Sequence, residues 1–208
     1  MSASETFNIA LSGCLAYSRL TAPLAALLRH HPSVSLRLQE QCLLDQHRGL
    51  MDGAFDAGLC QSADAPEGIK AWPVWQDALM LAIPPRHPLL TYESVPWIRA
   101  ADYSWIMLES GIYAEYGAQV KSLLHTAGVS PSAVTTVKSF ELMMTLVAAG
   151  YGLCLAPAAR MQGYGALGVT GRPLQGKSSE LTTYLLHSGH SDHALLKQLA
   201  ELLQIQPC

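Results

Sequence analysis

The sequence predicts an α/β protein made of two similar lobes joined by two crossover segments. Short apolar strands alternate with helices in a β-α-β-α-β order over residues 7–60, and the same order recurs over 105–156. The stretch 84–88 contains too many prolines to stay in a sheet, so it is expected to separate the two sets. Half of the 208 residues are hydrophobic, which is enough to bury a core in each lobe.

Composition excludes several classes of protein. The net charge is −3, from 13 basic and 16 acidic side chains, and no basic run occurs, which argues against nucleic-acid binding by this chain. The first ten residues lack the pattern of a secretory signal, and no apolar run approaches the ~20 residues that cross a bilayer. Five scattered cysteines suit a reducing compartment. A soluble, cytoplasmic protein without a membrane partner is expected.

The first set begins with an alternating strand over 7–11 and a turn at 12–13. After a helix, residues 34–38 alternate as a strand with one wet face, which is typical of a sheet edge. A second helix follows, and 55–60 is apolar enough for a third, parallel strand. The residues expected to face inward are Leu20, Leu24, Leu27 and Leu28 in the first helix, and Leu43, Leu44, His47, Leu50 and Met51 in the second.

The second half contains apolar strands at 78–83, 105–108 and 134–138, with a helix between the last two. A strand at 181–186 and a leucine-rich last helix have no partner nearby in sequence, so they are expected to return to the first half. The resulting boundaries are residues 1–77 and 166–208 for lobe I and residues 78–165 for lobe II.

A helix-to-strand unit begins at Ser139, which is a good N-cap for the helix that follows. Leu142 and Leu146 make this helix apolar nearly all round, so both of its faces are expected to be covered. Gly150 suits a left-handed cap, and Gly152 allows another part of the chain to approach closely before a short buried strand.

Part of this unit, Leu146-Val-Ala-Ala-Gly-Tyr-Gly-Leu-Cys-Leu-Ala-Pro157, resembles the VAAGxGxxxxP signature of LysR-type transcriptional regulators. Other segments are similar in order and spacing to the effector-binding part of that family, and the resemblance covers residues 6–205. These segments are Ile9-Ala-Leu-Ser-Gly13 followed by Pro23, His31-Pro32, Gly53-Ala-Phe-Asp56-Ala-Gly58 and Pro85-Arg-His-Pro88-Leu.

The resemblance implies the type 2 periplasmic-binding-protein fold, with a small effector in the cleft between the lobes. It also implies a homodimer or tetramer, with contacts through the second strand and the flank of the first helix around Arg29 and His30. The winged helix-turn-helix of the family is absent from this sequence. Promoter DNA would therefore be bound only through an N-terminal domain of a longer protein, and effector binding would modulate that DNA binding and transcription.

Candidate effector contacts lie at the carboxyl ends of the strands, where open parallel sheets bind ligands. Hydroxyl, thiol and N–H groups at these ends suit a carboxylate, so a small organic acid is the expected effector. No arginine is expected there, which leaves any anion selectivity to helix dipoles. Ser12 and Ser139 are alternatively mere helix caps. The predicted ligand-binding residues are Ser12, Gly13, Cys14, Cys42, Leu43, Cys60, Ser110, Gly111, Ser139 and Phe140, of which Cys14, Cys42, Leu43 and Phe140 are chosen partly by the resemblance.

Cys14, Cys42 and Cys60 follow three neighbouring strands, and convergent thiolates would suit a soft metal or a redox sensor. The competing interpretation is that these cysteines are small buried apolar residues, and the sequence has no C-x-x-C pair. No metal or cofactor is predicted.

The sequence has no nucleophile elbow, P-loop, dinucleotide fingerprint or H-E-x-x-H motif, so no enzyme is predicted. The main alternative to a regulator is a solute-binding protein of a transporter, which shares the fold. An export signal would distinguish that alternative.

Overall fold

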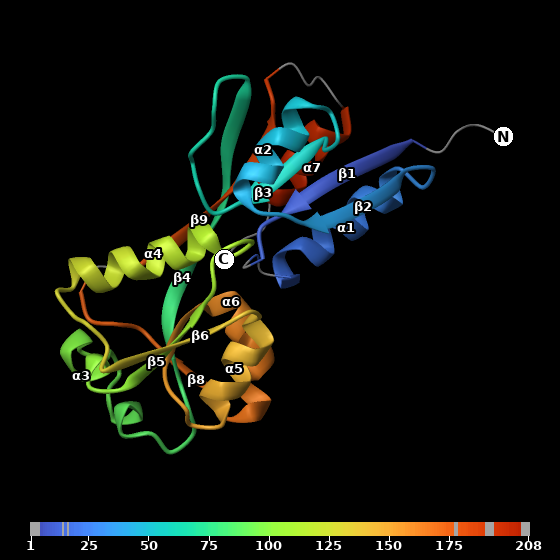
Figure 1. Ribbon diagram of the computed structural model, residues 1–208. Coiled ribbons are helices and arrows are strands. Elements are labelled where there is room, and N and C mark those ends of the chain that lie inside the picture. The colour runs from blue at the N-terminus through green and yellow to red at the C-terminus, as the bar shows by residue number, and fades with distance from the viewer. Residues whose placement is uncertain (1–4, 14, 16, 177–178, 190–193, 205–208) are drawn as a thin grey trace. The chain divides into compact units, whose positions relative to one another are not determined.

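The structure is a computed structural model that describes residues 5–13, 15, 17–176, 179–189 and 194–204 (Figure 1). The chain divides into two compact units. Unit 1 comprises Met1–Gln76 and Thr182–Cys208, and unit 2 comprises Asp77–Leu181. These boundaries differ from those expected for the lobes mainly over residues 166–181, because a short strand there pairs with the strand that opens unit 2.

Unit 1 is built on a sheet in which three parallel strands are followed by one antiparallel strand, in the order β2-β1-β3-β9. β2 lies at the edge, as its alternating pattern predicted. The elements of the unit are β1 (Thr6–Leu11), α1 (Tyr17–His30), β2 (Ser35–Glu40), α2 (Leu43–Met51), β3 (Ala57–Cys60), the first part of β4 (Ile69–Ile83), most of β9 (Glu180–Ser188) and α7 (Ala194–Gln204).

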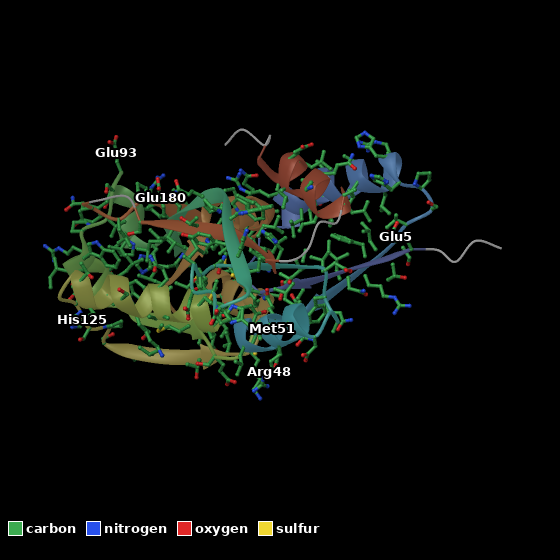
Figure 2. The ribbon with its side chains drawn as sticks, turned by 90° about the horizontal axis from the view of Figure 1, so that it is seen from above. Glu5, Arg48, Met51, Glu93, His125 and Glu180 are labelled. Atoms are coloured by element: carbon green, nitrogen blue, oxygen red, sulfur yellow. The ribbon has the colours of Figure 1, made fainter. Side chains whose placement is uncertain are left out.

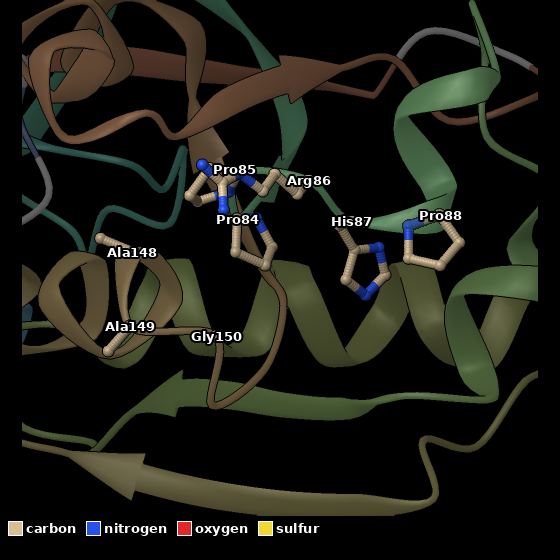
Figure 3. Close-up of a pocket in the computed structure, with 8 residues that line it drawn as sticks. All are labelled: Pro84, Pro85, Arg86, His87, Pro88, Ala148, Ala149 and Gly150. Carbon is tan, nitrogen blue, oxygen red and sulfur yellow. The ribbon is translucent and has the colours of Figure 1, made fainter.

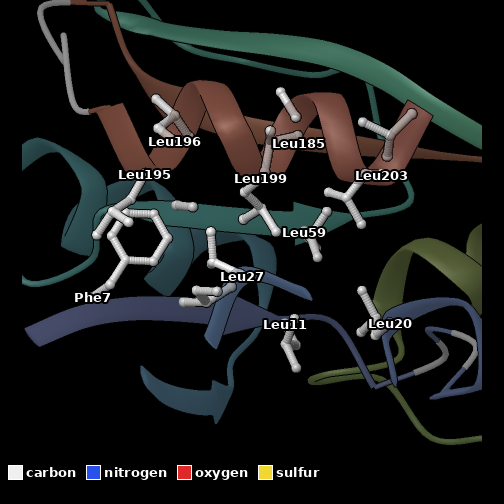
Figure 4. Packing of buried hydrophobic residues seen from close by; sticks show 14 of the residues in the cluster. Phe7, Leu11, Leu20, Leu27, Leu59, Leu185, Leu195, Leu196, Leu199 and Leu203 are labelled. Atoms are coloured by element: carbon white, nitrogen blue, oxygen red, sulfur yellow. The ribbon is translucent and has the colours of Figure 1, made fainter. Parts of the chain in front are cut away.

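One face of this sheet is covered by α1 and α7, which contact each other. Figure 4 shows Phe7, Leu59 and Leu185 of the strands against Leu27 of α1 and Leu199 of α7, and each of these side chains is at most 1% exposed. The last strand and helix therefore do return to the first half of the chain. They supply one side of its core.

The helix faces differ in part from those expected. Leu28 is 44% exposed, so the buried face of α1 does not include it. In α2 the buried residues are Gln46, Gly49 and Leu50, whereas Leu44 and Met51 are exposed. Figure 2 labels Met51 on this helix. On this buried side the ring of Phe55 packs against Gly49, where an added Cβ would lie 2.2 Å from a ring carbon.

Unit 2 contains a two-stranded parallel sheet, β5-β6, and an antiparallel group in which β4 pairs with β7 and β8. A parallel bridge between Trp105 and Leu153 links β5 to the start of β7. The elements are the second part of β4, η1 (Pro88–Thr91), α3 (Trp97–Ala101), β5 (Ser104–Leu108), α4 (Ala114–Thr126), β6 (Ala133–Val137), α5 (Phe140–Ala148), β7 (Cys154–Pro157), α6 (Ala158–Met161), η2 (Gln162–Leu167) and β8 (Thr170–Arg172).

The unit that begins at Ser139 forms largely as predicted. The Ser139 hydroxyl accepts a hydrogen bond from the Leu142 N–H at 3.2 Å, which caps α5. Gly150 has a φ of +82°, in the left-handed region. The expectation that both faces of α5 are covered is wrong at Leu142, which is 46% exposed because α5 is buried along only one stripe.

None of the helices within the described ranges is long and apolar enough to cross a membrane.

The backbone of β5 approaches Gly152 closely, as the sequence predicted. A Cβ added there would lie 2.6 Å from the carbonyl oxygen of Ser104. Because that oxygen is backbone and is held by the Leu153 N–H at 2.9 Å, it has little freedom to move. We expect Gly152→Ala to lower the free energy of unfolding by about 1–3 kcal/mol, measured by urea denaturation.

Gly163→Ala is the matched control, because nothing lies within 4 Å of a Cβ at that position. It should change stability by less than about 0.5 kcal/mol. Equal effects of the two substitutions would contradict this account of Gly152.

Candidate functional site

The carboxyl ends of β2, β1 and β3 meet at one edge of the unit 1 sheet, and backbone hydrogen bonds link them there. The Ser12 N–H donates to the Leu59 carbonyl at 2.9 Å, and the Gln41 N–H donates to the Leu11 carbonyl at 2.9 Å. Ser12 itself is 2% exposed. Residues that follow three adjacent strands are therefore held side by side, as parallel pairing requires.

A buried glutamine on α2 completes this arrangement. The amide nitrogen of Gln46 lies 3.1 Å from the Ser12 hydroxyl oxygen, 3.2 Å from the Gln41 carbonyl and 3.4 Å from the Leu59 carbonyl. One NH₂ group thus donates to groups at the ends of all three strands. The Ser12 hydroxyl oxygen accepts from this amide, so α2 helps to hold the Ser12 side chain at the end of β1.

Gln46 was not predicted as a site residue. Its side chain is fully buried, and its Oε1 has no hydrogen-bond partner among the described residues. That oxygen lies where a side chain at position 58 would be: a Cβ on Gly58 would approach it to 2.7 Å. Nothing in the sequence marked Gln46 as buried, because the inward face predicted for α2 consisted of the apolar residues on either side of it.

The other predicted residues of unit 1 differ in accessibility. Gly13 is buried, and Cys14 lies outside the described residues. Cys42 is the N-cap residue of α2 and is partly exposed, with its sulfur 3.1 Å from Asp45 Oδ2; Leu43 follows it and is also partly exposed. Cys60 is fully buried and donates to the Ser62 carbonyl at 3.2 Å.

In unit 2 the predicted residues fall at two places. Ser110 and Gly111 are exposed in the turn after β5, where Gly111 has a φ of +96°. Ser139 is partly exposed at the start of α5, and Phe140 beside it is fully buried. Phe140 is therefore part of the wall around this helix start rather than an open surface.

An arginine lies beside this helix start, contrary to the expectation that none would. The Arg160 guanidinium is 3.8 Å from the centroid of the Phe140 ring, and its Nη2 is 3.2 Å from Glu141 Oε1. The Arg160 side chain is 5% exposed, whereas that of Glu141 is 63% exposed. Sequence analysis missed Arg160 because it is far from α5 in sequence and reaches it only through the turn of α6 that follows Pro157.

Tyr164 also belongs to this group of side chains. Its ring centroid is 5.9 Å from that of Phe140. Partial burial raises the pKa of the Tyr164 phenol, and the Glu141 carboxylate raises it further, while Arg160 acts in the opposite direction. The phenol therefore stays protonated at neutral pH and can donate a hydrogen bond.

The cysteines differ in chemical character. Burial raises the pKa of the Cys154 thiol far above its usual range, so this sulfur is an apolar core atom. No group of three His, Cys, Asp or Glu side chains in the described part of the chain is placed to hold a metal ion. Because Cys14 lies outside the described residues, the convergence of Cys14, Cys42 and Cys60 stays a prediction.

A separate cavity of about 480 Å³ lies in unit 2 at the C-terminal end of α5 (Figure 3). It is lined by the proline-rich segment 84–88 and by residues 148–150, and Arg86 there has a φ of 62°. Burial lowers the pKa of His87, whose Nδ1 accepts from the Leu89 N–H at 3.2 Å. None of the predicted ligand-binding residues lines this cavity.

Solved structures share this architecture. The effector binding domain of BenM with its effector benzoate superposes with a TM-score of 0.87, at 24% identity, over 98% of this chain and 92% of that one. The effector binding domain of QuiR in complex with shikimate gives 0.82, at 16% identity, over 97% and 96%. The reduced OxyR regulatory domain from Pseudomonas aeruginosa gives 0.84, at 18% identity, over 98% of each. The fold is therefore that of type 2 periplasmic-binding proteins.

The sequence comparison is more specific. Residues 2–206 match the family model of the LysR substrate binding domain, so the chain belongs to that family. The HTH-type transcriptional regulator BenM of Acinetobacter baylyi is 26% identical over 159 residues, which are 76% of this chain and 52% of BenM. A "probable hydrogen peroxide-inducible genes activator" of Mycobacterium avium is 30% identical over 139 residues, 66% of this chain and 44% of that protein. The chain thus spans about half the length of these regulators.

We expect Gln46→Ala to lower the free energy of unfolding by about 1–3 kcal/mol, measured by urea denaturation. The substitution removes the donor shared by three strand ends and leaves buried carbonyl oxygens without it. Gln39→Ala is the control, since Gln39 is exposed on the edge strand β2, and it should cost less than about 0.5 kcal/mol. A Gln46 variant as stable as the Gln39 variant would show that the three contacts contribute nothing net.

The cysteines should react at different rates with N-ethylmaleimide. We expect Cys42 to be alkylated in the native protein, whereas Cys60 and Cys154 are protected until the chain unfolds, because both sulfurs are buried and burial also raises the pKa of the Cys154 thiol. Peptide mass spectrometry of timed reactions, with a denatured sample as the control, measures this. Native alkylation of Cys60 as fast as that of Cys42 would contradict the burial described for Cys60.

Proposed function

We propose that this chain is the ligand-sensing regulatory domain of a LysR-type transcription factor and performs no catalysis itself. The match of residues 2–206 to the LysR substrate binding domain carries this proposal. Relatives named as transcriptional regulators, about twice the length covered by this chain, support it. The transporter alternative shares the fold but not that pattern of relatives.

The proposed effector is a small organic acid. BenM and QuiR, whose domains have this fold, are described with benzoate and shikimate, and both molecules carry a carboxylate. In this chain Ser12 lies at the carboxyl end of β1, and the Gln46 amide holds its hydroxyl oxygen there. Gly13, Cys42, Leu43 and Cys60 follow the same strand ends, Cys14 is proposed from its place in the sequence, and Ser110, Gly111, Ser139 and Phe140 are the proposed counterparts in unit 2.

Regulation would follow because effector binding is coupled to the conformational equilibrium of the domain. An effector that binds one conformation of the domain more tightly than another shifts the population toward that conformation, and the shift is limited by the difference in affinity. We propose that the full-length protein is a cytoplasmic homodimer or tetramer. In it, the shift would change how N-terminal DNA-binding domains hold promoter DNA. The proposed dimer contacts use β2 and the flank of α1, where Arg29 and His30 are exposed.

A thermal-shift screen of small acids, aromatic compounds and soft metal ions tests this function. A ligand that binds only the folded state raises the melting temperature. We expect carboxylates, with benzoate and shikimate as the first probes, to stabilise the domain. Ser12→Ala should raise the dissociation constant of a stabilising acid by about 10-fold or more, since a hydrogen bond to a charged group is lost.

Ser35→Ala on the exposed edge strand β2 is the matched control and should leave the affinity unchanged. Stabilisation by acids that is equal in the Ser12 and Ser35 variants would place the effector away from Ser12. Stabilisation by metal ions but by no acid would contradict the proposed effector class.

A further inference from the structure

The cavity of about 480 Å³ at the C-terminal end of α5 has no role in the proposed function. Its volume lies within the ~300–1,000 Å³ that is typical of small-molecule sites. Figure 3 shows its two walls: the segment 84–88 forms one, and the last turn of α5, with Ala148, Ala149 and Gly150, forms the other. All eight lining residues belong to unit 2.

The proline-rich wall is held in place by packing and by a hydrogen bond. Pro85 lies against Gly168, where an added Cβ would come within 3.1 Å of the proline ring. The ring of His87 packs edge-on against that of Tyr103, with 4.4 Å between centroids, and its Nδ1 accepts from the Leu89 N–H at 3.2 Å. Because proline also has a fixed φ, this wall loses little conformational entropy when a ligand binds.

Arg86 takes a backbone conformation that L side chains rarely adopt. Its φ of 62° is the only positive value at a non-glycine residue in the described part of the chain. Such strain is concentrated at functional sites, since elsewhere a glycine would relieve it. The Arg86 side chain is exposed and makes no hydrogen bond or ion pair with any residue that the structure describes. No internal polar contact of that side chain therefore accounts for the strain.

The opposite wall offers hydrogen-bond acceptors. The N–H groups of residues 149–151 donate back into α5, whereas the carbonyl oxygens of Ala148 and Ala149 accept no backbone hydrogen bond from the described residues. Gly150, with a φ of +82°, then turns the chain out of the helix. The C-terminal end of a helix carries about half a negative charge, so this wall favours a cation.

We propose that this cavity is a second ligand site and that it binds an α-amino acid with an apolar side chain. The ammonium group of the ligand lies at the carbonyl oxygens of Ala148 and Ala149, and its carboxylate lies at the guanidinium of Arg86. The proline rings contact its side chain. The inference goes beyond the proposed function, because it places a ligand away from the strand ends and from Ser12.

A zwitterion suits the two walls better than a simple acid or a simple amine. An acid would pair with Arg86 but would face the negative end of the α5 dipole, and an amine would face the charge of Arg86. Burial lowers the pKa of His87, so its ring is neutral at neutral pH, and because Nδ1 is an acceptor the proton is on Nε2. That N–H can donate to a carboxylate without adding a second positive charge.

Three compounds of similar shape test the ligand class. L-Phenylalanine carries both charges, 3-phenylpropionate lacks the ammonium group, and phenethylamine lacks the carboxylate. We expect isothermal titration calorimetry on the 208-residue chain to give L-phenylalanine a dissociation constant about 5-fold or more below that of phenethylamine. In the Ser12→Ala chain, where acid binding at the strand ends is weakened, it should also lie about 5-fold or more below that of 3-phenylpropionate.

Replacing Arg86 separates ligand binding from stability. Arg86→Asn removes the charge but keeps a residue that tolerates a left-handed φ, and Arg86→Gly also relieves the strain. Both should raise the L-phenylalanine dissociation constant by about 5-fold or more, while the urea midpoint of unfolding does not fall. A purely structural Arg86 that neutralises the α5 dipole predicts the reverse, a lower midpoint and unchanged binding. Arg37→Asn, on the exposed edge strand β2, is the control and should change neither.

Filling the cavity tests its location independently. Ala149 is exposed at the C-cap of α5 and lines the cavity, so Ala149→Leu should raise the L-phenylalanine dissociation constant by about 10-fold or more through steric exclusion. Ala114→Leu, at an exposed position of α4 that does not line the cavity, is the matched control and should bind L-phenylalanine as the unaltered chain does.

Four results would overturn the inference. They are no binding of L-phenylalanine, phenethylamine binding as tight as that of L-phenylalanine, L-phenylalanine binding unchanged by Arg86→Asn or by Ala149→Leu, and L-phenylalanine binding that is lost in the Ser12→Ala chain. The last result would place the amino acid at the strand ends. In each case acid binding that depends on Ser12 would leave the proposed function standing, so the two proposals fail separately.

Discussion

The carboxyl end of a parallel sheet must find hydrogen-bond partners for groups that the ladder no longer satisfies, and in unit 1 one side chain meets this constraint. The Gln46 amide donates toward the ends of β1, β2 and β3 at once. The Leu59 carbonyl also accepts from the Ser12 N–H, so loss of the amide would remove the shared donor without leaving that carbonyl unpaired. A buried polar group that loses its partner costs about 1–3 kcal/mol, which is a large part of the stability of a small domain. The rotation of α2, the glycine at 58 and the orientation of Ser12 all follow from placing Gln46 there.

Unit 2 meets a related constraint with backbone alone. Leu153 and Ser104 are linked by a hydrogen bond of 2.9 Å, and Ile106 donates to the Leu153 carbonyl at 2.8 Å. This close pairing requires that residue 152 have no side chain. The same glycine therefore joins β7 to β5 and fixes the exit of α5. The segment that carries the family signature is mainly structural for this reason, since its glycines determine where α5 ends and β7 begins.

Strands, helices and their order could be predicted because they depend on local patterns. The alternation at Phe7, Ile9 and Leu11, and the cap and glycines around α5, are readable without knowing any tertiary contact. The rotation of α2 could not be predicted, because the helix face with four apolar residues is more hydrophobic than the face that contains Gln46. Hydrophobicity favoured Leu44 and Met51, but the hydrogen-bond requirement of three strand ends decided the outcome.

The electrostatics at the start of α5 show the same limit, and magnitudes decide which group contributes the larger positive charge there. A helix N-terminus offers about half a charge and stabilises an anion by about 0.3–1 kcal/mol at an exposed position. Two unit charges 4 Å apart interact by about 1 kcal/mol in water but about 4 kcal/mol at an effective dielectric constant of 20. Arg160 is 5% exposed, so its full charge outweighs the dipole of α5.

Position in the fold, rather than local sequence, supplies that charge. An arginine in the short stretch after Pro157 has no pattern that marks it as a partner of α5. It reaches the helix because β7 ends at the proline and α6 turns the chain back onto Phe140. The acidic residue in the first turn of α5, which by itself suggests a simple response to the helix dipole, is then better understood as the counter-ion of a buried cation. Because Glu141 remains in contact with water, it neutralises Arg160 with little desolvation of its own carboxylate.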